Sequence, residues 1–342
     1  MKAALFRENG GPEVLSYEDI AEPEAGPFDV VVKVRAAALN HLDLWVRKGG
    51  PHYKYSFPHI TGSEGAGDVV RVGSCVENIK EGDAVLVTPA WSCNRCEFCL
   101  NDEEPMCLSY GMLGIARKGC FAEYVAAPAE TIYPMPSNLS YEEAASIPLV
   151  FLTAWHMLIS RARIKPGEDV LVQAAGSGVG IAAIQIAKLY GARVFATAST
   201  DEKLQKAKTL GADVLINYKE KDFGEEIRAI TGKRGVDVIF EHTGSENWEK
   251  NVKSLARRGR LVTCGATSGY QSQIDIRFIY SRGLSILGSY MGSKKDMFEM
   301  LHFVRAGKLR PVIDSVFPLS ELRKAEEKMQ QRNLFGKIIV RP

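Results

Sequence analysis

The stretch DVLVQAAGSGVGIAAIQIAKLY, residues 169–190, joins an apolar strand to a glycine-rich turn and an apolar helix that stops before Gly191. Small residues in such a turn let the backbone approach a pyrophosphate, and the N-terminus of the next helix supplies unpaired N–H groups and the positive end of a dipole. The alternative is a tight strand-to-helix turn without a ligand. Although strict GxGxxG spacing is absent, the context predicts a nucleotide-binding turn, whose residues are Gly176, Ser177, Gly178, Val179 and Gly180.

Strands and amphipathic helices keep alternating after this turn as far as about residue 290. Five further apolar segments follow the first strand, separated by helical patterns or short connections: 193–198, 213–217, 236–241, 260–265 and 284–290. Alternation of this kind predicts an α/β fold with a doubly wound parallel sheet.

Before residue 150 the hydrophobic rhythm is different. Short β-rich stretches broken by Gly and Pro, at 29–39, 65–73 and 82–90, are typical of a partly open β-barrel or sandwich. The closing residues, ending in LFGKIIVRP, read as a helix and a strand that return to this β-rich part. We therefore expect one domain over 1–148 and 291–342, and a second over 149–290.

The composition limits the partners of the chain. It has 342 residues and a formal net charge of only +2, without a long basic run, so we expect neither nucleic acid nor a membrane surface as a partner. The N-terminus, MKAALFRENG, lacks the apolar core of a signal peptide, and no apolar run is long enough to span a bilayer. We therefore predict a cytoplasmic protein whose partners are small molecules or copies of itself.

Four cysteines are clustered in a short lobe at about 91–110, at Cys93, Cys96, Cys99 and Cys107. This spacing suits four thiolate ligands of a tetrahedral zinc ion. A closed shell leaves no position for water or substrate, so we expect one structural zinc per chain that clamps the lobe. A redox-active thiol pair and an iron centre are the alternatives.

The residues at the end of the second predicted strand, 193–198, indicate which coenzyme the chain prefers. Versions of this fold that prefer NAD place an acidic residue there for the ribose hydroxyls, whereas this chain has Ala198, followed by Ser199 and Thr200. Without that carboxylate a 2′-phosphate is not repelled, and Lys203 can pair with it. We predict NADPH rather than NADH; the alternative is that Lys203 is an ordinary solvated helix residue.

Taken together, these motifs resemble the medium-chain dehydrogenase/reductase superfamily, which includes the zinc alcohol dehydrogenases and the quinone oxidoreductases. The resemblance covers nearly the whole chain and rests on DVVVKVRAAALNHLD, HITGSEGAGDVVRVG, the cysteine lobe, FAEYV, AAGSGVG and GKIIV. It implies a GroES-like catalytic domain, a Rossmann coenzyme domain, an active-site cleft between them, and a homodimer formed by edge pairing of the last Rossmann strands, or a homotetramer.

The catalytic zinc of the alcohol dehydrogenases has no matching ligand set here. The family places a Cys, a His followed by Glu, and a third Cys or acidic residue at positions that correspond here to Asn40, Ser63 and a residue near Leu149. Only Glu64 is kept, and Leu42 replaces the hydroxyl that starts the family's proton relay. A rearranged metal site is the alternative; its ligands would come from His41, Asp43, His52, His59 and His156.

Asn40 and Asp43 instead look like the NxxD of the zinc-free quinone oxidoreductases. That resemblance implies an NADPH-dependent reductase of an activated acceptor, such as a quinone or an α,β-unsaturated or aromatic ketone, with Asn40 and Ser63 lining the acceptor site. Tyr53 is a candidate proton donor, or a packing residue. The residues that would surround the 2′-phosphate are Ser199, Lys203, Tyr218 and Arg332. Two other classes stay open: a zinc alcohol dehydrogenase with unconventional ligands, and a coenzyme-binding dimer without catalytic activity.

Overall fold

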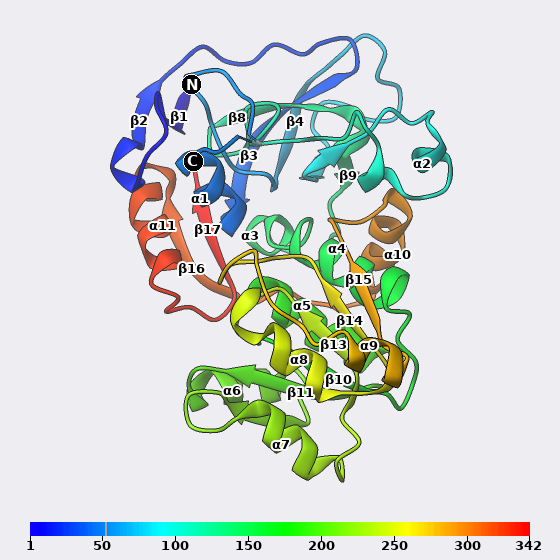
Figure 1. Ribbon diagram of the computed structural model, residues 1–342. Helices are drawn as coiled ribbons and strands as arrows, with labels where there is room; N and C mark the ends of the chain where they lie inside the picture. The colour runs from blue at the N-terminus through cyan, green and yellow to red at the C-terminus, as the bar shows by residue number, and fades with distance from the viewer. Residues whose placement is uncertain (52) are drawn as a thin grey trace. The chain divides into compact units, whose positions relative to one another are not determined.

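The computed structural model describes residues 1–51 and 53–342 and comprises two compact units (Figure 1). The first unit contains residues 1–149 and 311–342, and the second contains residues 150–310. The segment 291–310, which we expected in the first domain, lies in the second unit. The reason is packing: α10 (Lys294–Arg305) contacts α4 (Val150–Trp155), with the rings of Trp155 and Phe303 5.3 Å apart.

The second unit is built on a six-stranded parallel sheet of order β12-β11-β10-β13-β14-β15. Numbered along the chain from β10, this is the order 3-2-1-4-5-6 of a Rossmann sheet, and it confirms the predicted doubly wound fold. The strands are β10 (Asp169–Val172), β11 (Arg193–Ala198), β12 (Val214–Asn217), β13 (Val236–Glu241), β14 (Leu255–Thr263) and β15 (Ser285–Gly288). Most residues of β10, β11 and β13 are buried, as expected for strands covered on both faces.

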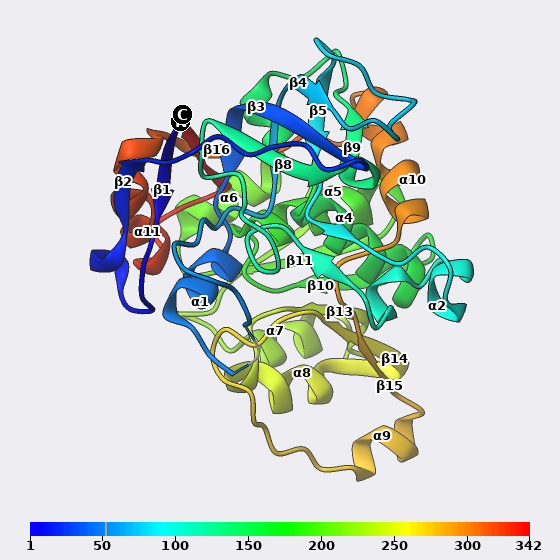
Figure 2. The same ribbon diagram turned by 90° about the horizontal axis from the view of Figure 1, so that it is seen from above.

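Helices cover both faces of this sheet. Figure 2 shows α5 (Gly178–Leu189) and α6 (Asp201–Thr209) on one side of the strands, and α7 (Phe223–Ile230) and α8 (Trp248–Ser254) on the other. A short α9 (Arg277–Arg282) precedes β15, and α4 continues into a π-helix over His156–Arg161. One buried cluster, which includes Leu171, Phe195 and Ile239, packs against α7 and α8. The strand–turn–helix unit of residues 169–190 therefore begins at the centre of the sheet.

The first unit is built on a seven-stranded sheet of order β16-β17-β3-β4-β5-β9, with β8 paired to β3. Its strands are β3 (Asp29–Ala38), β4 (Gly65–Val72), β5 (Ala84–Val87), β8 (Tyr124–Pro128), β9 (Ile132–Pro134), β16 (Ile313–Pro318) and β17 (Lys337–Arg341). Two small sheets pair β1 (Lys2–Leu5) with β2 (Ser16–Asp19), and β6 (Ala90–Trp91) with β7 (Gly111–Met112). β17 pairs antiparallel with β3, so the end of the chain returns to the β-rich unit as predicted.

The α-helices of the first unit, in the residues that the structure describes, are α1 (His41–Lys48), α2 (Glu97–Leu100), α3 (Tyr141–Ala145) and α11 (Leu322–Gln330). Two residues, Leu39 and Asn40, connect β3 to helix α1. A capping box fixes that start, because the backbone N–H of Asn40 donates to the Asp43 carboxylate at 2.8 Å. The backbone around Asn40 is therefore held in place by both β17 and α1.

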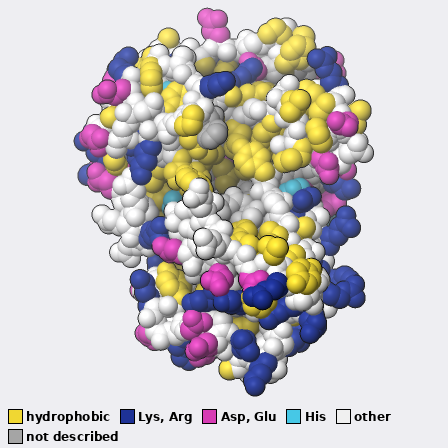
Figure 3. Space-filling view, in the orientation of Figure 1, with side chains coloured by type: hydrophobic (Ala, Val, Ile, Leu, Met, Phe, Trp, Pro, Cys, Tyr) yellow, Lys and Arg dark blue, Asp and Glu magenta, His cyan; other side chains and the backbone are white. Residues whose placement is uncertain are grey.

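The distribution of charged side chains on the surface is consistent with the small net charge of the chain. Acidic and basic side chains are intermingled over the face that Figure 3 shows, including the helices of the second unit. Among the described residues, no helix is both long and apolar enough to cross a bilayer.

Candidate active site, coenzyme turn and metal centre

The four clustered cysteines converge on one point beside α2. Their sulfur atoms all lie within 4.8 Å of one another, with 3.9 Å between the Sγ atoms of Cys93 and Cys99 and 3.5 Å between those of Cys96 and Cys99. Zinc–thiolate bonds of about 2.3 Å in a tetrahedron place sulfur atoms about 3.8 Å apart, so the set fits zinc. The sequence-based prediction of a four-cysteine metal cluster is confirmed.

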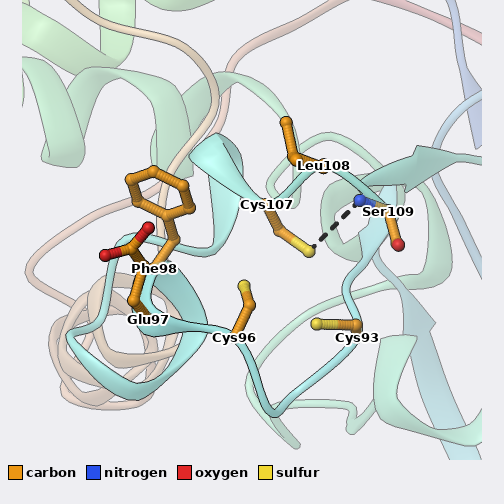
Figure 4. Close-up of a pocket in the computed structure, with 7 residues that line it drawn as sticks. All are labelled: Cys93, Cys96, Glu97, Phe98, Cys107, Leu108 and Ser109. Atoms are coloured by element: carbon orange, nitrogen blue, oxygen red, sulfur yellow. Dashed lines mark hydrogen bonds between the residues drawn. The ribbon is translucent and has the colours of Figure 1, made fainter.

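Backbone N–H groups surround these sulfurs. The N–H of Ser109 donates to the Cys107 sulfur at 3.4 Å, and Figure 4 shows the sulfurs of Cys93, Cys96 and Cys107 pointing toward a common centre. A hydrogen bond from the backbone N–H of Arg95 lowers the pKa of Cys93 to about 6. The pKa of Cys99 is also lowered, whereas that of Cys96 is raised to about 11 by its neighbouring cysteines, so only part of the set favours the thiolate form before a metal ion binds. Four thiolates complete a closed shell, so this centre has a structural role in the lobe.

A second cluster, without cysteine ligands, lies at the end of β3. Asn40 is 7% exposed and Glu64 is fully buried, and the Asn40 Nδ2 atom donates to Glu64 Oε1 at 2.9 Å. The other carboxylate oxygen, Glu64 Oε2, accepts from the backbone N–H of Leu149 at 2.6 Å. Glu64 therefore links Asn40 to Leu149.

Lys337, which the sequence analysis did not single out, completes this cluster. Its side chain is 5% exposed, and its Nζ atom lies 2.9 Å from Glu64 Oε1. The same atom donates to the carbonyl oxygen of Leu39 at 2.9 Å and to Asn40 Oδ1 at 2.6 Å. The carboxylate of Glu64 and the ammonium of Lys337 form a buried ion pair, so each neutralises the other's charge.

Ser63 precedes Glu64 and β4. Its hydroxyl is buried and has no hydrogen-bond partner among the described residues, as is also true of Thr61. Between them Gly62 has a φ of +95°, and a Cβ at this position would lie 2.8 Å from the ring of Phe121. Only glycine fits there, so the backbone that carries Ser63 has a fixed shape. An unpaired buried hydroxyl is costly unless a ligand satisfies it.

These residues do not fit a catalytic zinc ion. Zinc sites use thiolate, imidazole or carboxylate ligands. At the three positions expected to carry such ligands, this chain has the amide of Asn40, the hydroxyl of Ser63 and the aliphatic side chain of Leu149. Glu64 is the one charged ligand, and both of its oxygens already accept hydrogen bonds. The Asn40 oxygen faces an ammonium group, which repels a second cation.

The described histidines of the rearranged-site alternative, His41, His59 and His156, do not form a ligand group. His59 is buried and its Nε2 atom bonds the carbonyl of Gly114 at 3.0 Å, whereas His41 is exposed and packs beside Trp45. His156 belongs to the second unit, where it pairs with Asp296 at 2.7 Å. His52 lies outside the described residues. Among the residues described, the cysteine cluster is the one group of three or more metal-binding side chains within reach of a shared ion.

Asp43 and Tyr53 both lie close to the core of the first unit. Asp43 accepts the backbone N–H groups of Asn40 and Gly62, and burial raises its pKa to about 7. The ring of Tyr53 packs against the hydrophobic core, and its backbone N–H bonds the carbonyl of Gly50. The role of Tyr53 as a proton donor therefore stays a prediction.

The glycine-rich turn of the second unit has the shape expected for a nucleotide-binding turn. Ser177 caps α5, because its hydroxyl accepts the N–H of Gly180 at 3.0 Å. A Cβ on Gly180 would lie 2.6 Å from the carbonyl oxygen of Ala174, so a side chain would push the helix away from the strand. Ala174 itself has a φ of +46°, and its N–H bonds the Thr197 hydroxyl at 3.3 Å. The turn is thus strained and held in place before any ligand binds.

His242 also belongs to this turn, although the sequence analysis missed it. It follows β13, and its Nε2 atom lies 3.0 Å from the carbonyl oxygen of Gln173 and 3.4 Å from the Ser177 hydroxyl. Burial lowers its pKa, which favours the neutral ring. The ends of β10 and β13 meet where the strand order reverses, which is the position at which ligands bind in such sheets. Only the predicted sheet topology could have brought His242 to attention.

The residues predicted for the 2′-phosphate are divided between the two units. In the second unit, Ser199 follows β11, Lys203 lies in the first turn of α6, and the N–H of Tyr218 bonds the carbonyl of Ala198 at 3.1 Å. These three residues therefore lie at neighbouring strand ends. Arg332 belongs to the first unit, where it follows α11. Its part in coenzyme binding stays a prediction.

Comparison with known proteins defines the class. A family model for zinc-binding dehydrogenases matches residues 178–306, and one for the alcohol dehydrogenase GroES-like domain matches residues 26–137. An alcohol dehydrogenase of Geobacillus stearothermophilus is 35% identical, with 100% of this chain and 99% of the relative covered. A quinone oxidoreductase of Sus scrofa is 32% identical, with 99% and 97% covered. A solved structure described as an NAD-dependent alcohol dehydrogenase is 48% identical, with a TM-score of 0.96 and both chains fully covered.

The chain belongs to the medium-chain dehydrogenase/reductase superfamily, and its two units are a GroES-like domain and a Rossmann-like domain. It is similar both to alcohol dehydrogenases and to quinone oxidoreductases, so it is an oxidoreductase of this superfamily. The resemblance noted from the sequence is confirmed.

Proposed function

We propose that this protein is an NADPH-dependent reductase of activated acceptors, such as quinones and α,β-unsaturated or aromatic ketones, which uses no catalytic metal. The observation that carries the proposal is the hydrogen-bonded cluster of Asn40, Glu64 and Lys337, which fills the place of a metal-ligand set. The cysteine cluster holds one structural zinc ion.

An acceptor without a Lewis acid beside it must be electrophilic already, and its oxygen must meet hydrogen-bond donors. The bound coenzyme supplies hydride from its nicotinamide ring. Ser63 offers a hydroxyl that has no hydrogen-bond partner in the part of the chain that the structure describes, and Asn40 offers an amide whose second hydrogen makes a 3.3 Å contact with the Ala38 carbonyl. Both groups are suited to stabilise negative charge that develops on the acceptor oxygen. Tyr53 is the proposed proton donor.

The coenzyme preference rests on the end of β11. Ala198 is buried and brings no carboxylate to repel a 2′-phosphate, and Lys203 lies one turn into α6. With Ser199, Tyr218 and Arg332 these residues form the proposed 2′-phosphate site. Two relatives are named as NAD-dependent alcohol dehydrogenases, so NADH is the competing coenzyme.

The names of those relatives also favour a second function, the oxidation of alcohols. In this chain that function would require a second, unconventionally bound zinc ion. A third function, coenzyme binding without turnover, predicts tight NADPH binding and no acceptor. For all three we propose a homodimer formed along β15, or a homotetramer.

Zinc content and an acceptor screen together test the proposal. The protein is purified without added metal, dialysed against a weak chelator, and its zinc is measured by elemental mass spectrometry. We expect one zinc ion per chain, turnover of quinones or enones with NADPH, and poor turnover of simple alcohols. Two zinc ions and oxidation of alcohols would replace this function with the second, and NADPH binding without turnover would replace it with the third.

Cysteine variants provide the matched control. Cys96→Ser should remove the single zinc ion, whereas Cys75→Ser, at an exposed cysteine outside the lobe, should leave it bound. If Cys96→Ser still retained one zinc ion per chain, that ion would occupy another site and the proposal would fail.

A further inference from the structure

Lys337 is the first residue of β17, and its ammonium group makes three hydrogen bonds within the cluster that it forms with Asn40 and Glu64. An ammonium has three N–H donors and no acceptor. Three oxygen atoms surround its Nζ atom, on Leu39, Asn40 and Glu64, at 2.9, 2.6 and 2.9 Å. All three N–H groups of Lys337 are used in these hydrogen bonds. Lys337 therefore neither protonates the acceptor substrate nor hydrogen-bonds to it directly.

The orientation of the Asn40 amide follows from these two charged neighbours. Its oxygen faces the Lys337 ammonium, and its nitrogen faces the Glu64 carboxylate at 2.9 Å. A flipped amide would place the oxygen against the carboxylate and the NH₂ group against the ammonium, and both contacts would be repulsive. The ion pair therefore admits one orientation only.

That orientation also strengthens the amide as a donor. A cation on the carbonyl oxygen of an amide draws electron density from its nitrogen, and hydrogen bonds arranged in a chain polarise one another. The second hydrogen on the Asn40 nitrogen makes a long contact of 3.3 Å with the carbonyl of Ala38. This hydrogen is the one that can turn to another acceptor at low cost.

We infer that Lys337 is a positioning residue of the acceptor site, which fixes and polarises the Asn40 amide so that its N–H can bind the acceptor oxygen. The inference rests on the proposed function, because it assigns Lys337 a part in that reaction. It differs from a purely structural role, in which Lys337 only neutralises the buried charge of Glu64.

Removing the charge from both Lys337 and Glu64 distinguishes the positioning of Asn40 from the neutralisation of buried charge. Lys337→Met leaves Glu64 buried without its cation, so it should reduce both stability and turnover. Lys337→Met combined with Glu64→Gln removes the unpaired charge and keeps an acceptor for the Leu149 N–H. The combined variant should regain thermal stability, but the NH₂ group introduced at position 64 then faces the Asn40 nitrogen, and the Asn40 oxygen has lost its ammonium donor. The Asn40 amide should therefore flip or lose its fixed orientation.

Steady-state kinetics with NADPH and the best acceptor of the screen give the first measurement. We expect kcat to stay at least about 30-fold below wild type in the combined variant, within the range seen when a transition-state donor is lost or misplaced. The Kd for NADPH, measured by fluorescence titration, should change less than about twofold, which is small against a tenfold step in affinity. Recovery of kcat to near wild type along with stability would overturn the inference and leave Lys337 a structural role.

The side-chain amide resonance of Asn40 gives a second measurement, which does not depend on turnover. The ¹H–¹⁵N signal, assigned from its loss in Asn40→Ala, should be shifted and slow to exchange in wild type, and both properties should disappear in the combined variant. An Asn40 signal that is unchanged in this variant would also overturn the inference. If wild type reduces no acceptor, the proposed function fails, and the amide signal still decides whether Lys337 orients Asn40.

Discussion

Arg47 and Glu326 form an ion pair in which neither side chain is exposed to solvent, and the Arg47 Nε atom lies 2.7 Å from Glu326 Oε2. Arg47 lies in the last turn of α1 and Glu326 lies in α11. The pair therefore joins the helix that follows Asn40 to the helix that precedes Lys337. It holds together the two segments that carry Asn40 and Lys337 of the buried cluster.

Removing one partner of this pair should be strongly destabilising. Arg47→Met leaves the Glu326 carboxylate buried without a cation, and we expect the free energy of unfolding to fall by about 3–5 kcal/mol. Arg47→Met with Glu326→Leu should recover most of that loss, because no buried charge remains. Chemical denaturation of the three proteins checks this. A combined variant as unstable as Arg47→Met would show that packing of the arginine, not charge, stabilises the contact.

Asp43 should make stability depend on pH. Burial raises its pKa to about 7, against hydrogen bonds from the N–H groups of Asn40 and Gly62 that lower it. The folded chain therefore keeps a proton on Asp43 that the unfolded chain releases near pH 4. The stability that Asp43 contributes is complete below about pH 4 and is lost as the pH rises through about 7. For this group alone the loss is on the order of 4 kcal/mol.

Two aspartate variants distinguish the contribution of Asp43 from that of the other titratable groups to the pH dependence of stability. Asp43→Asn cannot ionise, so its free energy of unfolding should change less between pH 4 and pH 8 than that of wild type. Asp213→Asn is the control, because the pKa of Asp213 is lowered and its own effect lies at more acidic pH. Denaturation curves across this range would contradict the assignment if Asp43→Asn kept the wild-type slope.

The cysteine lobe should unfold locally when its metal is removed. Four thiolates on a short segment with few buried residues depend on the ion to stay together. In Cys107→Ser we expect rapid proteolysis within residues 91–110, while Cys75→Ser resists protease as wild type does. Mass spectrometry of the fragments locates the cuts, and cleavage elsewhere first would argue against a lobe clamped by metal.

The strands of the Rossmann-like domain could be predicted because buried parallel strands read as apolar runs. The four metal ligands could be predicted because they are close together in the sequence. Helix α10 was assigned to the wrong unit, since its amphipathic pattern does not say which surface it covers. β14 begins at Leu255 rather than near Arg260, because pairing with β13 extends it beyond its apolar part.

Lys337 was missed for a different reason. A lysine beside a glycine at the start of a strand is ordinarily exposed, and only the antiparallel pairing of β17 with β3 brings it to Asn40. His242 likewise reaches the glycine-rich turn only through the order of β10 and β13 in the sheet. Both residues depend on contacts between distant segments, which a local pattern does not contain.

The coenzyme preference should reverse when a carboxylate is restored to the end of β11. In Ala198→Asp the new charge would repel a 2′-phosphate, and in Lys203→Ala a cation would be lost. A charge-assisted hydrogen bond is worth about 1.5–3 kcal/mol, so kcat/KM for NADPH should fall about 10- to 100-fold in Lys203→Ala, with little change for NADH. Kinetics with both coenzymes check this. A wild-type enzyme that prefers NADH would refute the proposed 2′-phosphate site.

The exposed edge of β15 should mediate dimerisation. β15 ends the sheet order and is hydrogen-bonded to β14, with no strand on its other edge among the described residues, and Ile286 on it is 38% exposed. Charged residues discourage pairing of strand edges, so Ile286→Lys should yield monomers in light scattering coupled to size-exclusion chromatography. Ile230→Lys, at a residue of α7 that is 40% exposed, is the matched control and should remain dimeric. An Ile286→Lys protein with the wild-type mass would place the interface on another surface.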